Sequence, residues 1–179
     1  MKIAIVGAGI SGLATYLFLR KNVSDVELSI YEKHDMSAAA NPPSSGGSGV
    51  TIFPNGLRIL SELDSDLASE IYNHGDVRHK LQFRSAKGRD LGSLDLGGLE
   101  GPDYCVSITR QKLWRCLLKA VEEKNIVQSR VTAIREGPVV VADNGKEESV
   151  HLVIGADGIH SITRATLFSR LAESKSVKR

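Results

Sequence analysis

The spacing of apolar residues divides the first 32 positions of the chain into three elements. Residues 3–6 form a continuous apolar run that ends in glycine, which is typical of a strand buried on both faces of a parallel sheet. Residues 12–21 carry apolar side chains at helical spacing, and residues 26–30 then alternate apolar with polar positions. This order predicts a β-α-β unit, whose crossover we expect to be right-handed.

Weaker patterns follow along the rest of the chain. Thr109 has the side chain of a helix N-cap, and Trp114 in the helix after it is expected to pack in the core. Asp143-Asn144-Gly145 predicts a hairpin turn, because Asn-Gly tolerates positive φ. The other expected elements are a short helix after Pro54-Asn55, a strand over 81–83, a helix over 110–123, strands over 127–134 and 139–142, a second buried run over 152–154 and a last helix from 162.

Length and residue content favour a single domain. At about 150 residues per domain, a chain of 179 residues leaves little room for a second one. Residues 35–49 are rich in Pro, Gly and Ser, and we prefer a ligand-facing loop over a flexible linker, because long loops in compact domains are usually functional. We expect a nucleotide-binding domain over residues 1–172 and a disordered basic tail over 173–179.

Composition narrows the range of partners. A net charge of +2 gives no case for nucleic acid or an acidic membrane, and no apolar run reaches the length of a membrane span. The amino terminus lacks the pattern of a signal peptide. Cys105 and Cys116 fit neither a zinc pair nor a redox pair, and the five histidines are scattered, so we expect no metal site. Two structural thiols indicate a reducing compartment, the cytoplasm.

A glycine motif at the first predicted turn gives the clearest indication of a ligand. Gly7, Gly9 and Gly12 form G-x-G-x-x-G between a buried strand and a helix, and Glu32 follows at the end of the next strand. In such a motif the glycines allow a tight turn, close approach of a pyrophosphate and close helix–strand packing, and the acid accepts hydrogen bonds from a ribose. Because Glu32 would repel a 2′-phosphate, the nucleotide should be like NAD or FAD rather than NADP.

A second strand-to-helix turn contains an acidic residue. Asp157 follows the apolar run of residues 152–154, at the edge of a parallel sheet where ligands collect. The alternative is an Asp-Gly turn whose side chain caps its own helix. The residues alone leave the two interpretations open.

Four segments together resemble one enzyme family. They are the glycine motif with Glu32 in Tyr-Glu-Lys, the Gly47-Ser48-Gly49-Val50 segment leading into Pro54-Asn55-Gly56, Thr109-Arg110 with Leu113, and Val-Ile-Gly-Ala-Asp-Gly-Ile-His-Ser around Asp157. In this order and spacing they are similar to class A flavin-dependent monooxygenases, the salicylate-hydroxylase-like group. The resemblance covers essentially residues 1–168.

The resemblance implies an α/β fold with a Rossmann-like FAD-binding domain, a parallel sheet, a β-hairpin or meander insertion and flanking helices. It implies FAD as cofactor and NAD(P)H as a transient co-substrate, which reduces the flavin before O2 oxygenates a small aromatic or secondary-metabolite substrate. It carries over a set of FAD contacts: Gly7, Gly9 and Gly12 at the pyrophosphate, Glu32 at the adenosine ribose, Lys33 by the adenine, Gly47, Gly49 and Val50 along the ribityl chain and ring, Arg110 at the phosphate or ribityl region, and Asp157 near FAD and the nicotinamide. For Arg110 the alternative is a helix-start arginine that pairs with a surface acid.

The sequence departs from this family after residue 168. The family chain is roughly twice as long and has a second FAD motif, Gly-Asp-Ala-Ala-His, which does not occur here. We therefore expect an amino-terminal part whose activity needs the missing half or a partner chain, with self-association through an exposed sheet edge as a further outcome. A truncated gene model, an unspliced intron and a natural half-protein remain open, and the catalytic residues stay unknown. The alternatives are a non-catalytic nucleotide-binding remnant and a short NAD-dependent reductase, although no Tyr-x-x-x-Lys pair supports the latter.

Overall fold

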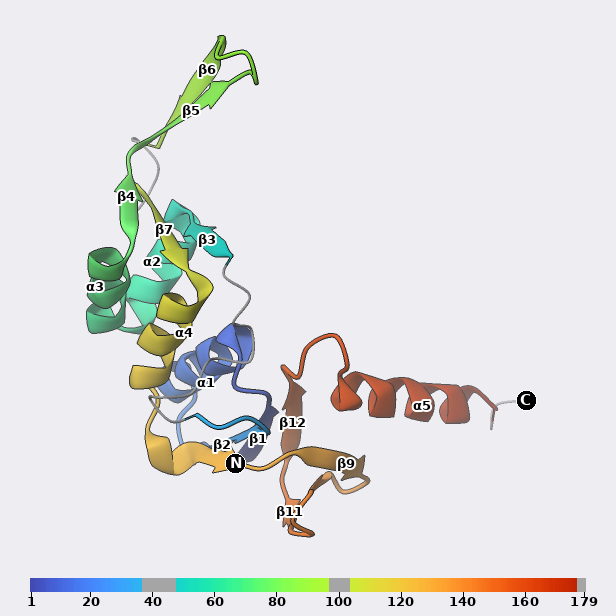
Figure 1. The fold of residues 1–179 in the computed structure, drawn as a ribbon. Coiled ribbons are helices and arrows are strands. Elements are labelled where there is room, and N and C mark those ends of the chain that lie inside the picture. The colour runs from blue at the N-terminus through green and yellow to red at the C-terminus, as the bar shows by residue number, and fades with distance from the viewer. Residues whose placement is uncertain (37–47, 97–103, 177–179) are drawn as a thin grey trace. The chain divides into compact units, whose positions relative to one another are not determined.

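The computed structural model describes residues 1–36, 48–96 and 104–176, and side chains as far as residue 169. Contacts between residues divide the chain into two compact units (Figure 1). Unit 1 comprises Met1–Ser44 and Leu117–Arg179, and unit 2 comprises Ser45–Cys116. The Pro/Gly/Ser-rich segment expected to face a ligand lies mostly outside the described residues.

A parallel sheet of four strands organises unit 1. Its strands are ordered β12-β1-β2-β8, so the chain pairs β1 first with β2 on one side and much later with β12 on the other. The order confirms the expected Rossmann-like arrangement of strands. The strands are β1 (Lys2–Val6), β2 (Glu27–Glu32), β8 (Ile126–Gln128) and β12 (Leu152–Gly155), and α1 (Ile10–Asn22) connects β1 to β2.

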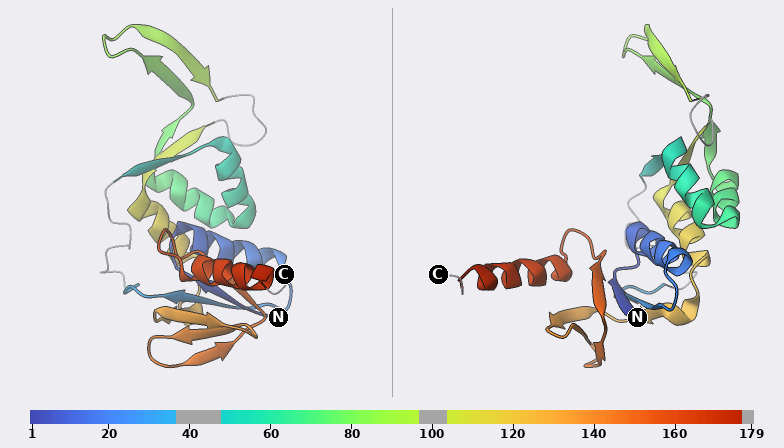
Figure 2. Two further views of the ribbon diagram at one scale, coloured as in Figure 1. Left: turned by 90° about the vertical axis from the view of Figure 1, so that its right-hand side faces the viewer. Right: turned by 180° about the vertical axis from the view of Figure 1, so that it is seen from behind.

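The two faces of this sheet bury different side chains. Ala4, Val6 and Tyr31 pack against valines of a three-stranded antiparallel sheet, which covers one face in Figures 1 and 2. On strands β1 and β2 the alternate residues Ile5 and Ile30 are fully buried, and α1 packs on the same two strands. The antiparallel sheet consists of β9 (Val131–Arg135), β10 (Val139–Ala142) and β11 (Glu147–Ser149). The turn between β10 and β11 confirms the hairpin expected at residues 143–145.

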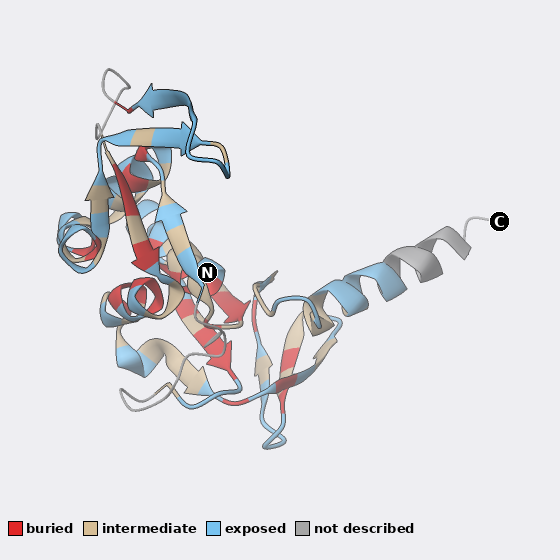
Figure 3. Cartoon of the chain, turned by 45° about the horizontal axis from the view of Figure 1, so that its top comes forward, coloured by how far each residue is buried: buried red, intermediate tan, exposed pale blue. Residues whose placement is uncertain are grey.

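Two sequence predictions in unit 1 are wrong in detail. Residues 127–134 are not one strand, because β8 belongs to the parallel sheet and β9 to the antiparallel one. Residues 152–154 are not fully buried: Leu152 is 45% exposed, because β12 is the last strand of its sheet in the part of the chain that the structure describes. Helix α5 (Ile162–Ser176) follows, and its exposed residues beyond the first turn are pale blue in Figure 3.

Unit 2 combines a pair of helices with antiparallel strands. Helices α2 (Pro54–Leu63) and α3 (Ser65–His74) pack on each other, and α3 also contacts the central strand of a sheet ordered β3-β7-β4. A two-stranded hairpin follows β4, and both of its strands are largely exposed (Figure 3). The strands are β3 (Gly49–Ile52), β4 (Asp76–Arg78), β5 (Lys80–Arg84), β6 (Asp90–Asp95) and β7 (Cys105–Thr109).

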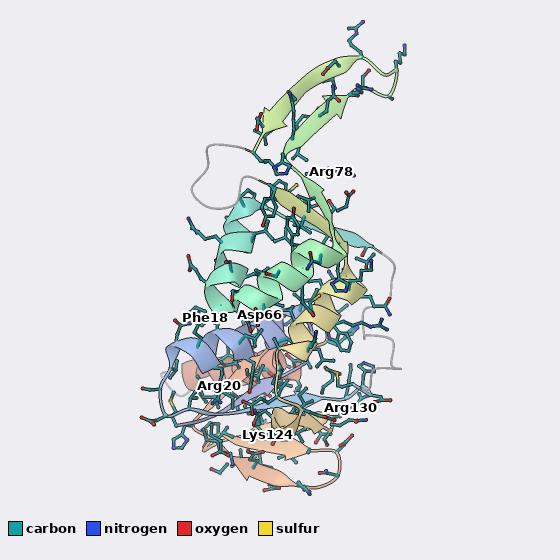
Figure 4. The ribbon with its side chains drawn as sticks, turned by 90° about the vertical axis from the view of Figure 1, so that its left-hand side faces the viewer. Phe18, Arg20, Asp66, Arg78, Lys124 and Arg130 are labelled. Atoms are coloured by element: carbon teal, nitrogen blue, oxygen red, sulfur yellow. The ribbon has the colours of Figure 1, made fainter. Side chains whose placement is uncertain are left out.

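The segment after β7 returns the chain to unit 1. Helix α4 (Arg110–Lys119) begins after Thr109, whose hydroxyl oxygen accepts a hydrogen bond from the Lys112 amide at 3.3 Å, so the expected N-cap is confirmed. The helix ends before residue 123, and a short 3-10 turn, η1 (Glu123–Asn125), leads into β8. Trp114 is buried, as expected. Glu122, just before η1, forms ion pairs with Arg20 of α1 and with Lys124 of η1, both labelled in Figure 4.

The helices within the described ranges are all too short or too polar to span a lipid bilayer.

Candidate functional site

The turn between β1 and α1 places the glycine motif at the carboxyl edge of the parallel sheet. Gly7 adopts a φ of +101°, a conformation that L side chains rarely reach, and its amide donates a 2.8 Å hydrogen bond to the carbonyl oxygen of Tyr31 on β2. The turn is therefore held against the neighbouring strand by its own backbone. Gly9 then stands at the N-cap of α1.

The turn after β12, which contains Asp157, lies directly beside the glycine turn after β1. The Ala156 amide donates a 2.8 Å hydrogen bond to the carbonyl oxygen of Val6, so the turn after β12 continues the pairing of the two strands. A Cβ atom on Gly7 would lie 2.5 Å from the Ala156 carbonyl oxygen, and one on Gly12 would lie 1.9 Å from the Gly7 carbonyl oxygen. Both positions therefore have no room for a side chain. β12 and β2 lie on opposite sides of β1, which is the switch point where open α/β sheets bind ligands.

The amino end of α1 is left open toward an anion. The N-cap residue Gly9 offers no side chain to cap the helix, the described residues show no side-chain hydrogen bond there, and the first turn holds no acidic residue. The helix therefore keeps the partial positive charge and the free amides of its first turn. A Cβ atom on Gly9 would meet nothing within 4 Å, so the backbone there can be approached closely. By contrast, Asp64 caps α3 by accepting hydrogen bonds from the amides of Asp66 and Leu67.

Glu32 ends β2 beside this turn, and only 5% of its surface is exposed. Its Oε2 accepts a 2.8 Å hydrogen bond from the amide of Ala8, and its Oε1 accepts one of 2.9 Å from the amide of His34. The Glu32 carboxylate thus lies at the carboxyl edge of the sheet, as the sequence predicted, and it accepts hydrogen bonds from the backbone amides of Ala8 and His34. Lys33 follows it on the surface.

Asp157 and Ser161 together hold the amino end of helix α5. The Asp157 carboxylate accepts hydrogen bonds from the Ser161 hydroxyl at 2.6 Å and from the amide of Thr163 at 3.2 Å. The Ser161 oxygen in turn accepts a hydrogen bond from the Arg164 amide. Burial acts to raise the pKa of Asp157, but these hydrogen bonds outweigh it and hold the pKa below its ordinary value. Of the two interpretations open from the sequence, the capping one describes these contacts.

The remaining predicted residues belong to unit 2 or lie outside the described residues. β3 and β7 pair so that Gly49 lies opposite Thr109 and Val50 opposite Ile108, and the Arg110 amide donates a 3.2 Å hydrogen bond to the Ser48 carbonyl oxygen. Residues about 60 positions apart in sequence are thereby brought together. A Cβ atom on Gly49 would make only an ordinary contact, so the fold does not require glycine there. Gly47 falls outside the described residues.

One polar cluster was not anticipated from the sequence. Glu148 on β11 accepts a hydrogen bond from the hydroxyl of Tyr31 on β2 and forms a 2.8 Å ion pair with Lys2 on β1. It ties the antiparallel sheet to the parallel one. Burial and the Glu148 carboxylate together raise the pKa of Tyr31. Burial acts to raise the pKa of Glu148 as well, but hydrogen bonds from Lys2 and Tyr31 outweigh it, and the net shift is downward. No sequence spacing links these three residues.

Comparisons with known proteins agree with this geometry. Residues 5–74 match the family described as NAD(P)-binding Rossmann-like domain. The chain is 31% identical to 3-amino-4-hydroxybenzoate 2-monooxygenase of Streptomyces cremeus over 93% of its own length and 42% of the relative's. It is 30% identical to the FAD-dependent monooxygenase terM of Tolypocladium album, over 98% of this chain and 36% of that one. Among solved structures, an HpxO variant of Klebsiella pneumoniae complexed with FAD has a TM-score of 0.74 at 24% identity, covering 92% of this chain and 41% of that one.

The curated relatives it matches are thus more than twice as long as the aligned part. The chain spans about two fifths of them and corresponds to their amino-terminal part. The match is to FAD-dependent monooxygenases, in agreement with the resemblance seen in the sequence motifs.

Proposed function

We propose that this chain, which is related to the amino-terminal part of FAD-dependent monooxygenases, binds FAD through the turn between β1 and α1. One observation carries the proposal: the uncapped amino end of α1 opens beside Gly9, at the β12-β1-β2 switch point, with no acidic residue in its first turn. Helix amino termini of this kind bind phosphate groups through free amides and the helix dipole.

The other residues supply the rest of the proposed contacts. Glu32 uses one hydrogen bond on each oxygen, and a carboxylate oxygen accepts two, so the adenosine ribose hydroxyls can bind to the remaining lone pairs. Lys33 lies on the surface next to it and is proposed to flank the adenine. Arg110 is proposed to reach the phosphate or ribityl region of FAD. The proposed contacts to the ribityl chain and ring come from Gly47, Gly49 and Val50, with Asp157 near FAD and the nicotinamide.

The reaction we propose is the hydroxylation or epoxidation of a small aromatic or secondary-metabolite substrate with NAD(P)H and O2. When bound, FAD would supply the hydride-transfer and O2 chemistry of such a reaction. The residues of this chain hold the dinucleotide by its pyrophosphate and ribose and keep it at the sheet edge. We propose that substrate recognition and turnover need the part of the relatives that the alignment does not cover, in the same polypeptide or in a partner chain. Cys105 and Cys116 are buried and form no disulfide with each other, which supports the cytoplasm as the compartment.

Flavin fluorescence tests the cofactor proposal. Titration of the protein into FAD should give a saturable change, and Glu32→Ala should weaken binding by about 1–3 kcal/mol through lost charge-assisted hydrogen bonds. The matched control is Glu27→Ala, because Glu27 begins the same strand and its side chain is 71% exposed. Absence of saturable binding by the unaltered chain would overturn the proposal.

A separate measurement addresses turnover. We expect the 179-residue chain to bind FAD without oxidising NAD(P)H in a substrate-dependent way, because it spans only about two fifths of its relatives. Substrate-dependent NAD(P)H consumption by this chain alone would show that it is a complete enzyme and would contradict the proposed need for a further part.

A further inference from the structure

We propose that Glu32 is a positioning residue that sets the shape of the glycine turn before any nucleotide binds. The inference rests on the proposed FAD site and goes beyond it, because the contact with a ribose needs the ligand and this role does not.

The contacts of the carboxylate support this role. Ala8 lies between Gly7 and Gly9 in the middle of the turn, is fully buried, and donates its amide hydrogen to Oε2 of Glu32. The other oxygen, Oε1, accepts the amide of His34, which fixes the side chain against the backbone just beyond β2. One buried carboxylate therefore connects the turn after β1 with the end of β2, across 24 residues of sequence.

Ala8 lies just before the helix end at which a phosphate group is proposed to bind. Gly7 has a positive φ and Gly9 has extended backbone at the N-cap, so the peptide groups around Ala8 set the direction of the first amides of α1. Hydrogen bonds to an ionised acceptor are about twice as strong as neutral ones. By accepting the Ala8 amide, the Glu32 carboxylate thus holds the turn and the first amides of α1 in a fixed direction. The same carboxylate also places a negative charge near the proposed pyrophosphate site.

Glu32 could act by binding the ribose or by positioning the turn, and the two roles predict different results when its charge is removed. If Glu32 only bound the ribose, its neutralisation would leave the flavin-free turn unchanged and would favour a ligand without ribose, because a negative charge is removed. If Glu32 positions the turn, its neutralisation loosens the flavin-free turn and weakens a ligand that has phosphates alone.

The experiment compares Glu32→Gln with Glu27→Gln in the full chain without flavin, using residue-resolved amide hydrogen exchange and titration with inorganic pyrophosphate. Gln at position 32 keeps the size of the side chain but has one carbonyl oxygen for two amide donors. We expect hydrogen exchange at the amide of Ala8 or His34 to accelerate about tenfold or more, because one of the two amides loses its hydrogen bond to a charged acceptor. We expect pyrophosphate to bind several-fold more weakly. The exposed Glu27, at the other end of the strand, should change neither quantity.

Unchanged exchange at both Ala8 and His34, or pyrophosphate binding that is unchanged or tighter in Glu32→Gln, would overturn the proposal. If Glu32→Gln does not fold, Glu32→Asp keeps the charge and shortens the reach by one methylene, and it should accelerate exchange at the same two amides. The exchange measurement uses flavin-free protein, so failure of the unaltered chain to bind FAD would overturn the proposed function without deciding this inference.

Discussion

The carbonyl oxygen of Ala156 occupies the space that a side chain on Gly7 would need, 2.5 Å from the position of its Cβ atom. Nearly 150 residues separate the two positions in the sequence, yet their turns lie against each other because β1 and β12 are neighbouring parallel strands. The glycine motif and the Asp157 motif therefore form one structural feature, and a change in either turn acts on the other.

This contact predicts different outcomes for the first two glycines of the motif. Gly7→Ala adds a side chain against the backbone of Ala156 at a φ of +101°, so we expect the free energy of unfolding to fall by at least about 2 kcal/mol. Gly9→Ala places its methyl group in open space at φ −70°, and we expect a loss of no more than about 1 kcal/mol, from the poorer N-cap. Urea unfolding of the flavin-free chain measures both.

The same pair of variants tests where the pyrophosphate binds. Gly9→Ala should lose most of its FAD affinity while it retains its fold, because the methyl group stands where the ligand approaches the backbone. A folded Gly9→Ala protein with unaltered FAD affinity would place the ligand elsewhere. A Gly7→Ala protein as stable as the unaltered chain would contradict the steric argument.

Capping of α5 by Asp157 predicts a stability effect that depends on pH. Asp157→Ala should lower the free energy of unfolding by about 1–2 kcal/mol near neutral pH, because the Ser161 hydroxyl and the Thr163 amide lose a charged acceptor. The pKa of Asp157 is lowered in the folded state, so its contribution is present above the unfolded value of 3.8 and is lost as the pH falls through the lower, folded pKa. The difference in the free energy of unfolding between the two proteins should therefore narrow as the pH falls below about 4. A constant difference down to the most acidic pH would contradict the cap.

The cluster of Lys2, Tyr31 and Glu148 predicts a similar dependence in a different place. Glu148→Gln should destabilise the chain by about 1–2 kcal/mol at pH 7, because Lys2 and Tyr31 lose a charged partner that is partly buried. The folded pKa of Glu148 lies below the unfolded value of 4.5, so its contribution is present above that value and disappears as the pH falls through the folded pKa. The exposed Glu147→Gln, at the neighbouring position of β11, is the matched control and should cost less than about 1 kcal/mol. Equal effects of the two variants would contradict the account of the cluster.

The parallel sheet and the glycine turn could be predicted because their signals are local. Apolar runs followed by glycine predicted β1 and β12, and apolar residues at helical and then alternating spacing predicted the β-α-β unit of β1, α1 and β2. Asp64 before Leu67 and Ile71 is an equally local signal, an N-cap followed by buried residues at helical spacing, and it would have predicted α3, where no element was expected from the sequence.

The features that escaped prediction depend on contacts between distant segments. Val127 and Val131 read as one strand, but they lie in two sheets because β8 pairs with β2 and β9 with β10. The exposure of Leu152 follows from the position of β12 at the edge of its sheet, which an apolar run cannot reveal. Likewise, the sequence placed Glu32 beside the turn, but only the structure shows that Ala8 and His34 already bind its oxygens.

Calorimetric titration of the 179-residue chain with FAD, ADP and FMN tests the central claim most directly. The proposed site binds the pyrophosphate and the adenosine ribose, which FAD and ADP possess and FMN lacks. The account predicts one saturable FAD site per chain, competition by ADP, and FMN binding at least about tenfold weaker, since a lost charge-assisted hydrogen bond costs more than 1.4 kcal/mol. FMN binding as tight as FAD, or no binding of FAD at all, would contradict the assignment of the β1–α1 turn as an FAD site.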